Sequence, residues 1–148
     1  MIEAKVTLTE AGKSGRQFVA RTGGGHYFLM DDKDGASGPK PIEMVAAALA
    51  GCTAFDVITI LRKKRQEINA YQVVVEADQA QEAPMVFTEV RIRHVITGHN
   101  VDPAAVEDAI RLSEGKYCSV GNMVNKTAKF TTTYEIVPVG TPELAGVR

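Results

Sequence analysis

The chain has 148 residues, of which 45% are hydrophobic and 24% are charged, the proportions of one ordinary soluble domain. Lys and Arg number 17 against 18 for Asp and Glu, so the formal net charge is −1. A chain without a cationic excess is poorly suited to the phosphates of nucleic acid or to an anionic membrane surface. We therefore expect one domain, 1–148, with neither nucleic acid nor a membrane as its partner.

The N-terminal region predicts a three-stranded antiparallel unit. Its first ten residues lack the basic and then apolar pattern of a secretory signal, which makes the cytoplasm the expected compartment. Residues 5–9 alternate as in a half-buried strand, and Gln17–Arg21 and His26–Met30 follow as short strands around three glycines. A loop rich in Asp, Gly and Pro then runs from Asp31 to Pro41.

A long apolar helix is predicted from about Pro41 to Glu67. Proline suits the first helical position, and Glu43 places a negative charge where the helix dipole favours it. Met44–Phe55 is apolar on every face, which indicates a helix that is buried all round. It is shorter than the roughly 20 residues of a membrane span. One small chain offers such a helix too little cover, so we expect a second subunit.

The second half of the chain predicts two strands, two helices and a final strand. Tyr71–Ala77 is the first of these strands. The apolar face of the next strand comprises Val86, Val90, Ile92 and Ile96. Asp102 and Pro103 are the N-cap and first residue of a helix to about Lys116, and a short helix follows Cys118. One face of the last strand comprises Phe130, Thr132, Tyr134 and Ile136.

The order of the predicted elements is βββ-α-ββ-α-α-β. Runs of strands around a few helices indicate an α+β fold rather than a doubly wound α/β sheet. Residues 139–148 are expected to form a frayed tail.

Two cysteines are the candidate reactive groups. Cys52 lies among small residues in the apolar helix, where burial would make a thiol inert, and Asp56 one turn on opposes a thiolate. Cys118 starts a helix beside Lys116, where the helix dipole would lower the pKa of its thiol. From the residues alone, plain packing and a redox couple are both open for this pair.

Two segments of the chain resemble the OsmC/Ohr superfamily, named for osmotically inducible protein C and the organic hydroperoxide resistance protein. Gly38–Cys52 is similar to the central-helix signature of that family, and Lys116–Val120 is similar to its second-cysteine motif. The order of the elements agrees from about Glu3 to Val137. Details such as Val95–Gly98 look closest to the less characterised branch that includes YhfA.

The resemblance implies an intertwined homodimer in which antiparallel sheets wrap around two long, buried central helices. It also implies a thiol-dependent peroxidase for organic hydroperoxides, active in oxidative stress defence. Cys52 would attack the peroxide and become a sulfenic acid, and Cys118 would resolve it as a disulfide. A dithiol reductant, which is a lipoylated protein for Ohr-like members, would restore the pair. No metal, haem or flavin is required.

The supporting residues match the family less closely. Ohr-like enzymes use an Arg to stabilise the thiolate; Lys13 falls in that register here, with Arg16 three residues on. Ile42 stands where those enzymes have a Glu ten residues before the first cysteine. Glu43 is nine residues before it, on the opposite face of the helix. Asp56 shares the face of the attacking cysteine, where we expect it to accept a hydrogen bond or to pair with a cation from the partner subunit.

A second function stays open beside the peroxidase: a dimeric small-molecule-binding or stress protein that keeps the fold and the cysteines but has little peroxidase turnover. Other sites are set aside. Asp32–Glu43 lacks the central glycine of a calcium loop, and His26, His94 and His99 show no metal-ligand spacing.

Overall fold

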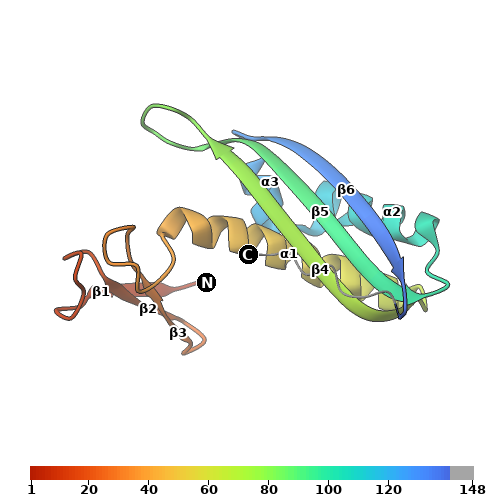
Figure 1. Cartoon of the computed structure of the whole chain (residues 1–148), viewed down its shortest axis with the longest axis horizontal. Helices are drawn as coiled ribbons and strands as arrows, with labels where there is room; N and C mark the ends of the chain where they lie inside the picture. Colours follow the sequence, from red (N-terminus) through yellow and green to blue (C-terminus); the bar gives the residue numbers. More distant parts are fainter. Residues whose placement is uncertain (141–148) are drawn as a thin grey trace. The chain divides into compact units, whose positions relative to one another are not determined.

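The structure is a computed structural model that describes residues 1–140, so the predicted tail lies outside the described residues from position 141 on. The chain divides into two compact units, residues 1–45 and the residues from 46 onward. In chain order the elements are β1 (Ala4–Leu8), β2 (Phe18–Thr22), β3 (Tyr27–Met30), α1 (Pro41–Lys63), β4 (Glu67–Gln79), β5 (Phe87–His99), α2 (Pro103–Leu112), η1 (Ser113–Tyr117), α3 (Ser119–Val124) and β6 (Lys129–Pro138). Figure 1 shows their course, and the predicted α+β fold class is confirmed.

The first unit contains the predicted three-stranded antiparallel sheet, in the order β1-β2-β3. The sheet leaves apolar side chains exposed on this chain, namely Val6, Leu8, Tyr27, Phe28 and Leu29. The loop after β3 is organised by the carboxylate of Asp31, which accepts hydrogen bonds from the hydroxyls of Ser14 and Ser37. These bonds lower the pKa of Asp31 to about 2.

Helix α1 begins at Pro41, as the sequence predicts, but ends earlier than predicted. Its predicted end was Glu67, whereas the helix stops at Lys63 and β4 already begins at Glu67. The backbone N–H of Gln66 bonds to the carbonyl of Leu61, and that of Arg65 to the carbonyl of Arg62. Arg65 has a φ of 58°. This is the hydrogen-bond pattern of a Schellman motif, which satisfies the last helical carbonyls and turns the chain into the sheet.

One face of α1 is covered by this chain. Its buried residues, Leu49, Thr53, Val57 and Leu61, repeat every four positions and therefore form a single stripe. Phe55 is 78% exposed, so the prediction of a helix buried all round is wrong for the single chain. The apolar character continues beyond Phe55, and by length and composition this helix could cross a membrane. Core helices of soluble proteins can have the same length and composition.

The second sheet has the order β4-β5-β6 and is mixed. β4 pairs antiparallel with β5, whereas β6 pairs parallel with β5. The predicted antiparallel arrangement therefore fails at β6. The segment α2-η1-α3 connects β5 to β6 and returns the chain to the end where β5 began, which makes the two strands run the same way.

The hydrophobic core of the second unit lies between this sheet and the helices α1 and α2, which cover the same sheet face (Figure 1). The buried core residues are Val57, Leu61, Ile96, Val101, Ala105, Val106, Ala109 and Ile110. The predicted apolar face of β5 is correct for Val90, Ile92 and Ile96. Val86 is 38% exposed and Phe87 is buried in its place, because the register shifts between Asp78 and Gln79 opposite this end of β5.

A substitution at Gly98 should destabilise the second unit strongly. A Cβ at this position would lie 2.1 Å from the carbonyl oxygen of Glu67 and 2.7 Å from Cγ2 of Val101. We expect Gly98→Ala to lower the free energy of unfolding by about 3 kcal/mol, the upper range for overpacking. Chemical denaturation of both proteins measures this difference. Gly115→Ala, whose Cβ would have no neighbour within 4 Å, is the matched control, and an equal loss there would contradict the steric explanation.

Candidate active site

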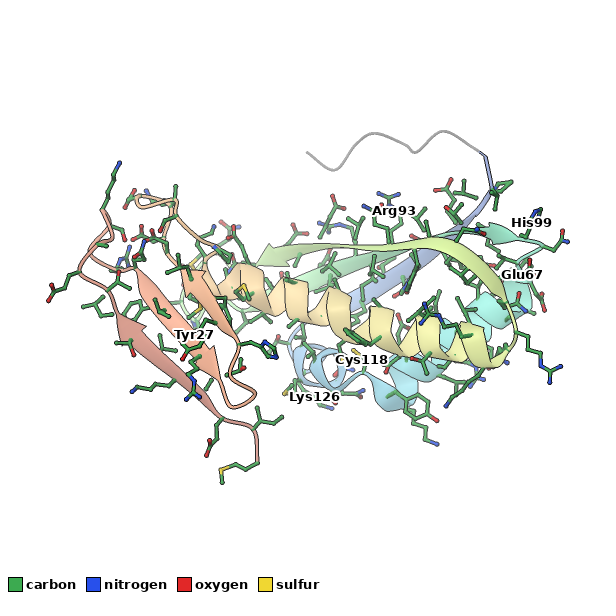
Figure 2. The ribbon with its side chains drawn as sticks, turned by 90° about the horizontal axis from the view of Figure 1, so that it is seen from below. Tyr27, Glu67, Arg93, His99, Cys118 and Lys126 are labelled. Carbon is green, nitrogen blue, oxygen red and sulfur yellow. The ribbon has the colours of Figure 1, made fainter. Side chains whose placement is uncertain are left out.

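The structure brings three of the predicted site residues together. Cys52 and Asp56 lie one turn apart on α1, and Cys118 lies between η1 and α3. The two sulfur atoms and a carboxylate oxygen of Asp56 are all within 4.8 Å of one another. Both thiols are free, with Cys52 half-buried and Cys118 only 2% exposed. In Figure 2, Cys118 lies beside α1.

Cys118 is placed by a local change of helix type. The helix predicted to reach Lys116 ends its α-helical part at Leu112 and continues as one π-helical turn, Ser113–Tyr117. The backbone N–H of Cys118 closes that turn on the carbonyl of Ser113, at 2.8 Å. Its sulfur then caps α3 and accepts the N–H of Gly121 at 3.2 Å. A Cβ on Gly121 would lie 3.1 Å from this sulfur, so the close approach favours glycine.

The environment of Cys118 opposes ionisation of its thiol. The pKa is raised to about 12, chiefly by burial and in addition by the neighbouring Cys52 thiol and Asp56 carboxylate. The N–H of Gly121 acts in the opposite direction and is outweighed. The predicted lowering of this pKa by a helix dipole is therefore wrong, because α3 has only 6 residues and the sulfur is desolvated.

The carboxylate of Asp56 is held in place by Ser113. Oγ of Ser113 lies 2.9 Å from Oδ2 of Asp56 and 3.1 Å from Oγ1 of Thr53. An ionised carboxylate can only accept, so Ser113 donates to Asp56 and accepts from Thr53. Within residues 46–140 no Lys, Arg or His forms an ion pair with Asp56. Residues 46–140 thus place two thiols and one carboxylate together without an ion-paired cation.

A cavity of about 150 Å³ adjoins the sulfur of Cys118. Its apolar walls include Leu49, Ile92 and Phe130, and Glu114 contributes a polar edge. Glu114 accepts a hydrogen bond from the hydroxyl of Thr132. The cavity therefore offers an apolar surface next to the buried thiol.

The other predicted site residues belong to the first unit. Lys13 is exposed, and Arg16, whose side chain is 70% exposed, pairs with Asp32 at 2.5 Å. Glu43 accepts the backbone N–H of Lys40 at 2.8 Å and pairs with its ammonium at 3.3 Å. Glu43 therefore acts within α1 as a helix-start carboxylate. The catalytic support expected of Lys13, Arg16 and Glu43 stays a prediction.

A buried histidine–tyrosine pair was missed by the sequence reasoning. His94 is fully buried on the inner face of β5, and its Nδ1 lies 2.7 Å from the hydroxyl of Tyr71 on β4. Burial lowers the pKa of His94 to about 4 and raises the pKa of Tyr71. Nε2 of His94 has no hydrogen-bond partner among the described residues. The sequence does contain a signal for the burial of His94, because this residue continues the alternation of Val90 and Ile92 on the apolar face of the strand.

Comparison with known families shows which family the chain belongs to. Residues 32–133 match the model of the family described as "OsmC-like protein". The chain belongs to the OsmC family. The protein YhfA of Escherichia coli strain K12 is 40% identical over 136 residues, which cover 92% of this chain and 98% of YhfA. The predicted likeness to the YhfA branch of the OsmC family is confirmed.

Solved structures share the OsmC fold of this chain. A hypothetical protein from Aquifex aeolicus is 28% identical, with a TM-score of 0.82 over 93% of this chain and 97% of that one. An organic hydroperoxide resistance protein from Elizabethkingia anophelis is 18% identical, with a TM-score of 0.67 over 93% and 96% of the two chains. The second likeness is one of fold, because the sequence identity is low.

Proposed function

We propose that this OsmC-family protein is a cytoplasmic, thiol-dependent peroxidase that reduces organic hydroperoxides in oxidative stress defence. The observation that carries the proposal is the approach of the Cys52 and Cys118 sulfurs to within 4.8 Å. A disulfide would bring these two sulfurs from this separation to about 2.05 Å. The likeness of fold to an organic hydroperoxide resistance protein supports the choice of substrate class.

Cys52 is the attacking residue in this proposal, because it is the more exposed of the two thiols. Its thiolate attacks the terminal peroxide oxygen, the O–O bond breaks, and the alcohol leaves after taking up a proton. The product is the sulfenic acid of Cys52. The apolar cavity beside Cys118 supports a substrate with a hydrocarbon part.

Cys118 resolves the sulfenic acid. Its sulfur attacks that of Cys52, a disulfide forms, and the sulfenic oxygen leaves as water. One hydroperoxide and two thiols thus give one alcohol, one water and one disulfide. A dithiol reductant, such as a lipoylated protein, then returns both sulfurs to thiols by thiol–disulfide exchange.

A homodimer is part of the proposal. Large apolar side chains stay exposed on the single chain, in the first unit at Leu8 and Tyr27 and in the second at Phe55. A surface of this kind indicates a covering partner. A second copy of the chain would also give α1 the cover that its all-round apolar composition calls for.

The test is a count of free thiols on the reduced protein before and after one equivalent of cumene hydroperoxide, with hydrogen peroxide in parallel. We expect rapid loss of both thiols with the organic peroxide and a Cys52–Cys118 disulfide in the mass spectrum. Unreacted thiols after minutes would reject the peroxidase. The same assay on Arg16→Ala and Lys13→Ala identifies the cation that stabilises the thiolate. The variant that loses its thiols more slowly than the parent lacks that cation.

The cavity beside Cys118 favours a second candidate, a dimeric small-molecule-binding or stress protein with little peroxidase activity. The raised pKa of Cys118 fits a thiol that packs rather than reacts. In that case the thiols would react slowly with peroxide, and an apolar ligand would raise the melting temperature.

A further inference from the structure

We propose that the reduced protein binds one Zn²⁺ ion per chain through Cys52, Asp56 and Cys118. The inference goes beyond the proposed peroxidase and does not depend on it. It starts from the mutual approach of three ligand atoms, two sulfurs and one carboxylate oxygen, to within 4.8 Å. Sulfur and carboxylate oxygen are both established zinc ligands.

The placement of the ligands suits one small ion. Cys52 and Asp56 are four residues apart on α1, so both side chains leave the same face of the helix. Cys118 supplies the third ligand from the start of α3. Zinc bonds of about 2.0–2.3 Å place tetrahedral ligand atoms roughly 3.5–3.8 Å apart, so rotations that move each atom by about an ångström complete the site.

The surroundings of the three ligands support a cation. Residues 46–140 supply no ion-pairing side chain to Asp56. Ser113 holds the carboxylate at 2.9 Å, as an outer-shell partner orients a metal ligand. Cys52 is only half-buried, so water can reach the cluster and supply a fourth ligand.

Binding is a ligand exchange without oxidation or reduction. Hydrated Zn²⁺ gives up all but one of its waters, each thiol releases one proton as its sulfur coordinates, and the remaining water occupies the fourth position. Both sulfurs are then held as coordinated thiolates and are no longer free to form a disulfide. The bound ion would therefore protect the cysteine pair from oxidation.

The experiment measures zinc directly. The full-length reduced protein is equilibrated with ZnCl₂, freed of excess metal by gel filtration, and analysed for zinc per chain by atomic absorption. We expect one ion per chain, none after alkylation of the thiols with N-ethylmaleimide, and none in Cys52→Ser or Cys118→Ser. Substitution with Co²⁺ should give the visible bands of a tetrahedral site and a sulfur-to-cobalt charge-transfer band.

The carboxylate is tested by two variants that keep both thiols. Asp56→Asn should weaken zinc binding at least about 100-fold, and Ser113→Ala about 10–100-fold, in competition with a chromophoric chelator. Asp108→Asn, a carboxylate paired with Lys64 outside the cluster, is the matched control and should bind like the parent. Circular dichroism checks that each variant is folded. Parent-like affinity in Asp56→Asn or Cys118→Ser, or no zinc on the reduced parent, would overturn the site, whatever the peroxide assay gives.

Discussion

Replacing Cys52 by serine should abolish the reaction of the protein with cumene hydroperoxide. The proposed chemistry begins at this sulfur, and loss of an enzyme nucleophile costs several orders of magnitude in rate. We expect the rate of peroxide consumption to fall by roughly a thousandfold or more. Stopped-flow measurement of peroxide loss, with a dithiol reductant in excess, gives this number.

Cys118→Ser should separate the two chemical steps. In this variant Cys52 still attacks the peroxide, but no neighbouring thiol resolves the product. The sulfenic acid should therefore accumulate and be trapped by dimedone, with one adduct per chain in the mass spectrum. Dimedone labelling of Cys52→Ser, with Cys118 as the labelled residue, would reverse the assigned roles. Equal rates in the parent and both variants would reject the cysteine mechanism.

Stability should fall as the pH drops from about 6.5 to about 4, because of His94. Burial lowers the pKa of this residue to about 4, whereas an unfolded chain titrates it near 6.5. Between these values the unfolded state binds a proton that the folded state does not, so acid favours unfolding. The difference between the two pKa values corresponds to about 3 kcal/mol of the free energy of unfolding. The protein loses all of this stability below pH 4 and none of it above pH 6.5.

Denaturant titrations at several pH values and a fixed protein concentration measure the slope of the free energy of unfolding against pH. His94→Gln should remove most of it, whereas His26→Gln should keep it, because His26 is exposed. The carboxyls of Asp31, Asp78 and Asp108, whose pKa values are lowered by their hydrogen bonds, are unchanged in both variants. An unchanged slope in His94→Gln would show that another group is responsible.

The elements themselves were largely predictable from the sequence. Strand alternation located both sheets, and Asp102 with Pro103 marked the start of α2, where the Asp102 side chain accepts the N–H of Ala104 as expected. The end of α1 was not predictable to the residue. The left-handed position of its Schellman motif is occupied by Arg65, and the usual signal there is glycine or asparagine.

The sequence predicted the two cysteines and Asp56 as site residues, but not their surroundings. Resemblance to the family named Cys52 and Cys118, but the sequence cannot show burial, and burial decides the pKa of Cys118. The hydrogen bond between Ser113 and Asp56 joins residues that are 57 positions apart. Such a contact depends on how η1 packs against α1, which no local sequence pattern reports. The same holds for the hydrogen bond between Tyr71 on β4 and His94 on the neighbouring strand β5.

The separation of the two cysteines along the chain has a thermodynamic consequence. Their sulfurs are neighbours in space, yet the segment from 52 to 118 contains the second half of α1, the β4–β5 hairpin and all of α2. A cross-link between them would tether a long part of the unfolded chain and lower its entropy, which favours the folded state by about 4 kcal/mol. Folding and oxidation would then reinforce each other. The folded protein would hold its disulfide more firmly than the unfolded chain does, and a reductant would have to overcome that preference in every turnover.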